Sequence, residues 1–230
     1  PNVAQELVDL AREQLLLEAT GTMKATADRE MGYQLTDNGK ARALPLLKRF
    51  HMLNFPYLDN LAAAGVAPED VDIVFCTHLH IDHVGWNLDY TSGEPKPYFP
   101  NARYLGPRLD WEHFLKPEFA ANAPWVAHSV IPLEKMGLLE LIDDGYLVND
   151  EVTAISTPGH TPGHIVFDIT SDGEKAMVVG DLLHSKVQVE RPEWTAGVDT
   201  DKEASRRNRK MILDRAEAEG IVIAAGHFHP

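Results

Sequence analysis

The chain of 230 residues has a single cysteine, Cys76. One cysteine forms no internal disulfide, which excludes a secreted disulfide scaffold and a structural zinc site of four thiolates, and we expect Cys76 to be an inert small hydrophobic residue. No run reaches the ~18 consecutive apolar residues that a membrane span needs. The N-terminal PNVAQELVDLAREQ has acids where a secretion signal would have a basic start and an apolar run. We therefore expect a cytoplasmic protein, although the chain opens on Pro1 and its ends could have been trimmed.

Basic residues are also scarce. Lys and Arg total 21 against 35 Asp and Glu, which gives a formal net charge of −14. A field of that sign repels phosphate backbones and anionic lipid, so we expect neither nucleic acid nor a membrane surface as a partner. The 44% hydrophobic and 24% charged residues are those of a globular chain that can bury a core, not of a disordered one.

Hydrophobic periodicity predicts one αβ domain over residues 1–230, with an atypical, partly helical segment at 1–50. The amphipathic helix predicted at 3–19 would pack on a core or on a partner chain, which leaves a homodimer open. Further helices are expected at 55–64, 109–115 and 200–219, the last with a Thr200-x-x-Glu203 capping box. Strands are expected at 71–77, 102–106, 140–148, 151–157, 164–170, 175–181 and 221–226.

Histidine is abundant, at 11 residues, and its positions follow the predicted strands. Three apolar strands end in His78, His160 and His227, and a fourth ends in Asp181. Strand ends bring side chains from distant parts of a chain to one point on a rigid scaffold, while the adjoining loops admit a ligand. The pattern therefore indicates a site built at the edge of a sheet.

The densest group is HLHIDH, residues 78–83. In extended backbone His78 and His80 point the same way and can chelate one ion, whereas the adjacent Asp82 and His83 diverge and can reach a second ion. Imidazole and carboxylate suit zinc, iron or manganese, and the lack of thiolates argues against a purely structural zinc.

Four motifs, HLHIDH, TPGH with His160, GD with Asp181 and AAGH with His227, occur in an order that resembles the metallo-β-lactamase superfamily of dinuclear metallohydrolases, in its lactonase- and organophosphate-hydrolase-like branch. The resemblance implies an α/β fold, an αββα sandwich of two mixed β-sheets flanked by helices. It also implies a first metal held by His78, His80 and His160, a second held by Asp82, His83 and His227, and a bridge between them by Asp181.

The sequence departs from that family's pattern at its front. Only YQLTDNG, with Asp37 and Gly39, is similar to the turn that usually ends the N-terminal strands, so the completeness of the N-terminal sheet is in question. The chain also stops just after the last motif, where glyoxalase II relatives carry a helical domain. RNA-processing relatives carry a large insert, so the sequence disfavours both glyoxalase II and RNA-processing activities.

Other residues near the motifs are candidates for contact with a substrate. His184, three residues after Asp181 on an expected helical turn, would face the metals and orient substrate or protonate a leaving group, or else serve a structural role. His164 is expected to hold its turn by hydrogen bonds, just behind the ligands. Trp86 would form an apolar wall for substrate and Phe228 would lie at the mouth of the pocket. His229 competes with His227 as a ligand, and we favour His227 because it follows the strand directly.

The leading hypothesis is a dinuclear hydrolase of a small neutral ester or lactone, with two divalent metal ions, zinc first and iron or manganese as alternatives. A hydroxide bridging the ions would attack the carbonyl, Asp82 would orient it, and Asp82 or His184 would return a proton to the leaving oxygen. The expected partner is a small-molecule substrate, and the negative charge favours a neutral one.

Three alternatives stay open. The same ligands would serve an organophosphate or β-lactam hydrolase. They would also serve an iron-dependent sulfur dioxygenase or another redox member of the superfamily. A non-enzyme in which metals only tie the sheets together is the third, and the open position that such a ligand set leaves for water argues against it.

Overall fold

The computed structural model describes residues 61–228, and the chain from Val66 onward belongs to one compact unit. The predictions for helix 3–19, for YQLTDNG, for most of helix 55–64 and for His229 lie outside the described residues. Residues 61–63 are helical, in agreement with the end of helix 55–64. The single domain over 1–230 and the N-terminal sheet stay predictions.

The first sheet has three parallel strands in the order β1-β4-β5. These strands are β1 (Ile73–Phe75), β4 (Arg103–Pro107) and β5 (Leu139–Ile142). A short 3-10 helix, η1 (Pro68–Asp70), precedes β1. The crossover from β1 to β4 contains α4 (Ile81–Val84) and an antiparallel pair, β2 (Leu88–Asp89) with β3 (Lys96–Pro97). The crossover from β4 to β5 contains α5 (Arg108–Phe114), α6 (Pro117–Ala120), α7 (Pro124–Ser129) and α8 (Ile131–Lys135).

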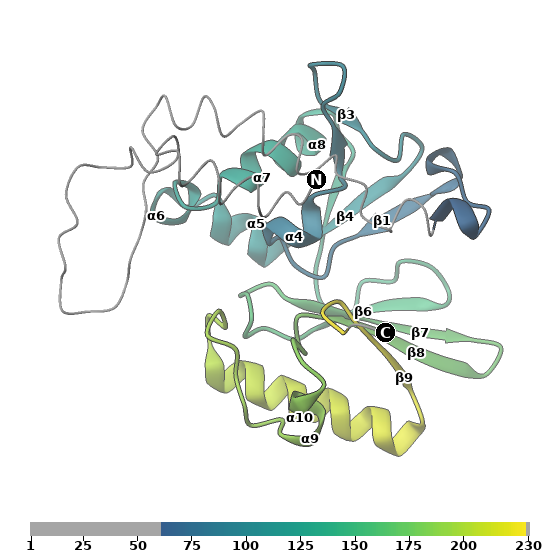
Figure 1. Ribbon diagram of the computed structural model, residues 1–230, viewed down its shortest axis with the longest axis vertical. Helices are drawn as coiled ribbons and strands as arrows, with labels where there is room; N and C mark the ends of the chain where they lie inside the picture. Colours follow the sequence, from purple (N-terminus) through teal and green to yellow (C-terminus); the bar gives the residue numbers. More distant parts are fainter. Residues whose placement is uncertain (1–60, 229–230) are drawn as a thin grey trace, which may run out of the picture. The chain divides into compact units, whose positions relative to one another are not determined.

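The second sheet has four strands in the order β6-β7-β8-β9. The strands β6 (Val152–Ser156), β7 (Ile165–Ser171) and β8 (Glu174–Gly180) are antiparallel neighbours, and β9 (Val222–Ala225) pairs parallel to β8. The short helix α9 (Val187–Glu190) and the long helix α10 (Lys202–Glu219) supply the crossover that a parallel pair needs. Figure 1 shows α10 running along this sheet.

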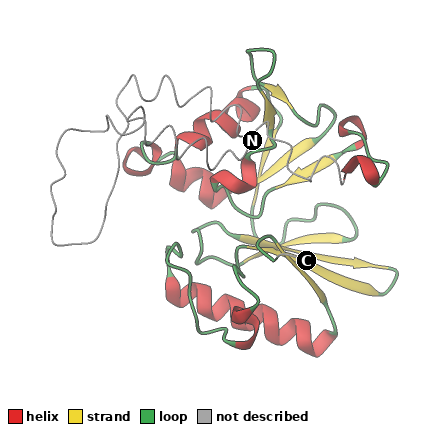
Figure 2. Ribbon diagram, viewed as in Figure 1, coloured by secondary structure: helices red, strands yellow, loops and turns green. Residues whose placement is uncertain are grey.

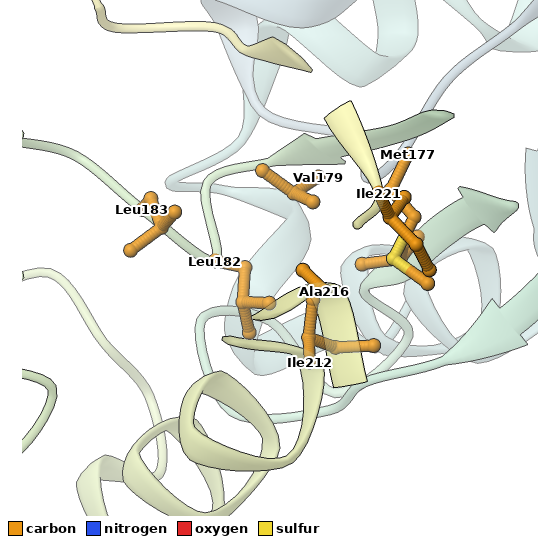
Figure 3. Close-up of a cluster of buried hydrophobic side chains, with 8 residues drawn as sticks. Met177, Val179, Leu182, Leu183, Ile212, Ala216 and Ile221 are labelled. Carbon is orange, nitrogen blue, oxygen red and sulfur yellow. The ribbon is translucent and has the colours of Figure 1, made fainter. Parts of the chain in front are cut away.

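Three apolar clusters hold these layers together. One lies between the two sheets and joins Leu105 and Ile142 to Ala154, Ile165 and Phe167. A second packs α4, α5 and α7 against the end of β1. The third packs α10 on the second sheet (Figure 3). Helices therefore lie outside two facing sheets (Figure 2), and the predicted αββα sandwich is confirmed.

Several details of the predicted elements are wrong. The β pattern predicted at 140–148 contains the turn signal DDG, and the strand ends at Ile142, just before that turn; beyond it only Leu147 forms an isolated bridge, to Thr153. The capping box is off by one residue, because Asp201 caps α10 by accepting from the Ala204 N–H. The proline-broken stretch after residue 120 begins two helices that were not predicted, α7 and α8, each with proline in its first turn, where proline is tolerated.

No helix within residues 61–228 combines the length and the apolar composition that a membrane span requires.

The core under α10 gives a test of the fold. Ile212 is 1% exposed and packs among Met177, Val179 and Leu182 (Figure 3), so Ile212→Ala removes buried methyl groups and leaves a cavity. We expect the free energy of unfolding, measured with urea, to fall by about 2–5 kcal/mol. The neighbouring Met211 is exposed, and Met211→Ala should change it by less than about 0.5 kcal/mol. Equal effects of the two substitutions would contradict the packing of α10.

Candidate metal centre

The predicted ligands converge because the ends of strands from both sheets approach each other. Asp181 follows β8 directly, His227 lies two residues after β9, and His78 lies three residues after β1. Gly180, with φ +48°, ends β8 against Thr77, and a Cβ there would be 2.4 Å from Thr77 Oγ1. Only glycine permits this approach, which places Asp181 next to the His78 segment.

A first group of donors consists of His78, His80 and His160, whose ligand atoms lie within 4.8 Å of one another. The Nδ1 atom of His80 lies 2.9 Å from Nε2 of His160. His78 is fully buried, its Nδ1 is 3.1 Å from Thr77 Oγ1, and its Nε2 has no hydrogen-bond partner within residues 61–228. Three imidazole nitrogens therefore face one point.

A second group consists of Asp82, His83, Asp181 and His227, again within 4.8 Å. His83 Nε2 and His227 Nε2 lie 3.0 and 3.1 Å from Asp181 Oδ1. Asp82 Oδ2 lies 3.4 Å from His83 Nε2 and 3.6 Å from His227 Nε2. The side chains of Asp82 and His227 are 53% and 38% exposed, so this side of the cluster is open to solvent.

Asp181 belongs to the second group but also faces the first. Its Oδ1 faces His83 and His227, while its Oδ2 lies 3.3 Å from His160 Nε2 and 3.8 Å from His78 Nε2. Burial raises the pKa of Asp181, but the contacts with His184, His83 and His78 outweigh it and hold that pKa well below its usual range. Asp181 is therefore a buried carboxylate anion in contact with both groups.

The protonation states suit metal binding. Burial, together with the neighbouring imidazoles, lowers the pKa of His78 and lowers that of His80 to about 4, so both rings are neutral and can ligate. Burial also lowers the pKa of His83, but contacts with Asp181 and Asp82 outweigh it and raise the value to about 9. A divalent cation would take the place of that proton.

The donor set fits two cations. A buried nitrogen without a partner, such as His78 Nε2, requires an explanation. A metal ion provides one, because it accepts the lone pairs of several imidazoles at once. Imidazole and carboxylate ligands suit zinc, iron or manganese.

The local backbone differs from the sequence interpretation. HLHIDH was expected to be extended throughout, but His80 is the N-cap of α4, and Asp82 and His83 lie on its first turn. The helix begins at Ile81, shortly after Leu79, whose backbone is held by Asp110 at its N–H and by Trp125 at its carbonyl.

His184 lies next to the donor cluster, as predicted, but the backbone that places it there is not the predicted one. Residues 181–186 form turns and bends in place of the expected helical turn, and the His184 N–H donates to Gln188 Oε1. Its Nε2 lies 3.2 Å from Asp181 Oδ2, and its ring stacks on that of His227, with centroids 5.5 Å apart. A ring that reaches the carboxylate between the two groups can also reach a ligand there.

His164 lies directly behind Asp181. It is fully buried, its Nδ1 is 2.9 Å from Thr157 Oγ1, and its Nε2 accepts from the Asp181 N–H at 3.2 Å. Burial lowers the pKa of His164 to about 3, so the ring is neutral. It links the β6–β7 turn to the end of β8 and holds the backbone of Asp181.

The two predicted substrate contacts lie against other side chains. Trp86 is half-buried, with its ring 5.2 Å from that of Tyr98, and Phe228 packs against the cluster under α10. The aromatic rings beside the first group are those of Phe114 and Trp125, whose centroids lie 5.8 and 6.5 Å from that of His80. These contacts leave the roles of Trp86 and Phe228 as predictions. Burial raises the pKa of Cys76 to about 12, as an inert thiol requires.

The sequence interpretation missed Asp110. This buried residue of α5 accepts hydrogen bonds from Leu79 N–H, Thr161 Oγ1 and Gly163 N–H, at 3.0, 2.8 and 2.6 Å. It therefore ties the HLHIDH segment to the turn that contains His160. Burial raises the pKa of Asp110, against the effect of these hydrogen bonds. No spacing in the sequence links an acid on one helix with two distant turns.

The interpretation also missed Asp199, whose Oδ1 lies 3.1 Å from His160 Nδ1. Burial raises the pKa of Asp199, and the hydrogen bonds of His160 and Ser205 outweigh it, so the net pKa lies below its usual value. Asp199 stands in a loop 39 residues beyond His160 among other acids, so the sequence gives no signal that singles it out.

The chain is similar to several known proteins. A family model described as the metallo-beta-lactamase superfamily matches residues 35–227. The chain is 31% identical over 129 residues to the N-acyl homoserine lactonase AttM of Agrobacterium fabrum, which covers 53% of this chain and 44% of that protein.

Two solved structures are also similar. Hydrolase AbOPH of the beta lactamase superfamily matches with a TM-score of 0.64 and 29% identity, over 74% of this chain and 61% of that one. The dizinc quorum-quenching lactonase AidC, in complex with the product N-hexanoyl-L-homoserine, matches with a TM-score of 0.60 and 26% identity, over 74% and 62%. The chain spans less than two thirds of the length of each of these three relatives.

His164 offers a test of the support behind the cluster. His164→Ala leaves the Asp181 N–H without its acceptor and removes the ring from the Thr157 hydroxyl, which keeps only its longer hydrogen bond, 3.4 Å, to the carbonyl of residue 164. We expect the free energy of unfolding of the metal-free protein to fall by about 1–3 kcal/mol, the cost of unpaired buried polar groups. His128 on α7 is a matched control, and His128→Ala should change it by less than about 0.5 kcal/mol. A His164→Ala protein as stable as the control would show that the ring does not hold this backbone.

Proposed function

This chain belongs to the metallo-β-lactamase superfamily, and we propose from that premise that it is a metal-dependent hydrolase of a lactone or a related small neutral ester. The observation that carries the proposal is the position of Asp181, whose two oxygens face two separate groups of histidines.

We assign the ligands by these groups. His78, His80 and His160 would hold one divalent ion, Asp82, His83 and His227 the other, and Asp181 would contact both. Zinc is the first expectation, with iron or manganese as alternatives. When bound, such ions supply Lewis acidity for a carbonyl oxygen and lower the pKa of water toward neutrality.

Protein side chains would supply the rest of the reaction. The Asp82 carboxylate is half exposed and lies at the open side of the cluster, where it can accept a hydrogen bond from the attacking water and orient it. His184, on the other side of Asp181, would donate a proton to the leaving oxygen as the ester bond breaks. Asp82 and His184 would therefore lie on either side of the carbonyl under attack.

Two further observations support a neutral lactone as substrate. AttM and AidC are both named as lactonases, and AidC is described with an opened lactone product. The net charge of −14 also disfavours anionic substrates. We also propose that Trp86 and Phe228 contact the substrate and form an apolar side of its binding site.

A direct test is turnover of N-hexanoyl-homoserine lactone by the purified chain, followed as the acid released on ring opening. We expect about two zinc ions per chain, activity that is lost after chelation and regained with zinc, and a lower melting temperature of the chelated protein, because an ion bound only by the native state stabilises it. If the chain hydrolyses only a phosphotriester or a β-lactam, the proposed lactone substrate is wrong.

If the purified chain contains iron and consumes oxygen, the proposal that it is a hydrolase is wrong. Full metal content without turnover of any ester would favour a purely structural role for the metals.

His184 is the residue whose role the ligand groups do not settle. His184→Ala should lower kcat by ~10²-fold or more, the usual effect of losing a proton donor, with zinc content unchanged. His113, on α5 and stacked on Phe119, is a matched control, and His113→Ala should leave kcat unchanged. An active His184→Ala enzyme would remove this residue from the reaction.

A further inference from the structure

The β6–β7 turn that contains His160 packs directly on the start of α10. A Cβ at Gly159 would lie 2.3 Å from the backbone nitrogen of Ser205, so no side chain fits between them. The Thr200 N–H and hydroxyl both donate to the His160 carbonyl, at 3.2 and 2.9 Å, and the Asp201 N–H donates to the Gly159 carbonyl. The backbone of His160 is therefore fixed by groups other than the side chain of Asp199.

Asp199 acts on the ring of His160. Both side chains are buried, and Asp199 Oδ1 lies 3.1 Å from Nδ1, the nitrogen that points away from the donor cluster. The opposite nitrogen, Nε2, faces Asp181 Oδ2 and His80 Nδ1. A carboxylate only accepts hydrogen bonds, so contact with Asp199 requires the proton on Nδ1 and leaves the lone pair on Nε2.

The carboxylate of Asp199 is itself held in place. Its Oδ2 accepts from Ser205 Oγ at 3.0 Å and from the Ala196 N–H at 3.2 Å, and Arg209 Nη2 lies 3.6 Å away. Arg209 is fully buried and also donates to the carbonyls of Leu182, Pro192 and Trp194. The guanidinium thus holds Asp199 and the segment just after Asp181 in one network.

We propose that Asp199 is a positioning residue for His160, which fixes the Nδ1–H tautomer and so directs the Nε2 lone pair toward the metal site. The expected effect on metal affinity rests on the proposed metal site, but the tautomer of His160 can be measured without metal. A carboxylate behind a ligating histidine fixes its tautomer and orientation, and its loss lowers metal affinity 10–100-fold in other sites.

The variant Asp199→Asn tests this more sharply than alanine. At the Oδ2 position the Ala196 N–H and Arg209 are donors only, so the amide oxygen of asparagine must lie there. The amide NH₂ then faces His160 Nδ1 and donates to it. The proton of the ring moves to Nε2, where it blocks the lone pair that a metal ion needs.

The first measurement is the tautomer of His160 in the metal-free protein, from long-range ¹H–¹⁵N spectra of the imidazoles, with the signal assigned by its loss in His160→Gln. We expect Nδ1–H in the unaltered chain and Nε2–H in Asp199→Asn. An Nε2–H tautomer in the unaltered chain overturns the proposal, and this holds even if Asp199→Asn does not fold.

The second measurement is zinc affinity by competition with a chelator. We expect Asp199→Asn to bind at least one zinc ion about 10–100-fold more weakly. Asp168→Asn is the matched control, because Asp168 on β7 pairs with Arg215 of α10 and, within residues 61–228, is paired with none of the donors. The zinc affinity of this variant should not change. A folded Asp199→Asn protein with unaltered affinity overturns the proposal. Failure of the unaltered chain to bind zinc overturns the proposed function instead, while the tautomer still tests the role of Asp199.

Discussion

One buried carboxylate determines how the rest of the site is arranged. Asp181 is almost inaccessible to solvent, and an isolated carboxylate there would be costly, so its charge has to be matched by the five imidazoles that lie within 3.8 Å of its oxygens. Those imidazoles come from four separate segments of the chain. Both sheets must therefore be in place before the carboxylate is compensated, which links the stability of the sandwich to the site.

The polar groups behind the donors make that arrangement rigid. His164 holds the Asp181 backbone, Asp110 ties the segment of His78 and His80 to the turn of His160, and Asp199 faces the far nitrogen of His160. Each lies in a dry environment where an unpaired polar group would be costly, so each network restricts the conformations that its neighbours can adopt. A ligand set held in this way is ordered before an ion binds, so binding costs little conformational entropy of the protein.

The two sides of the cluster differ in a way that matters for chemistry. The first group is buried, with His78 and His160 almost fully covered and aromatic rings beside His80. The second group is open, through the exposed edges of Asp82 and His227. The second group can therefore be reached from solvent, while low polarity around the first strengthens every electrostatic interaction there.

The sequence by itself determined most strands and helix α10, because alternating and apolar runs report burial directly. Its strand ends and the HLHIDH spacing indicated which side chains would gather at one edge of a sheet, while the αββα sandwich and the division into two ligand sets came from the resemblance of its motifs to the metallo-β-lactamase superfamily. Only the tertiary structure decided the rest. Asp110, Asp199 and Arg209 act on residues between 27 and 53 positions away, Thr200 holds His160 and does not cap α10, and His184 reaches Asp181 without a helical turn. These roles depend on contacts between chain segments that are far apart in the sequence. Hydrophobic periodicity and local spacing do not predict such contacts, because they report only on neighbouring residues.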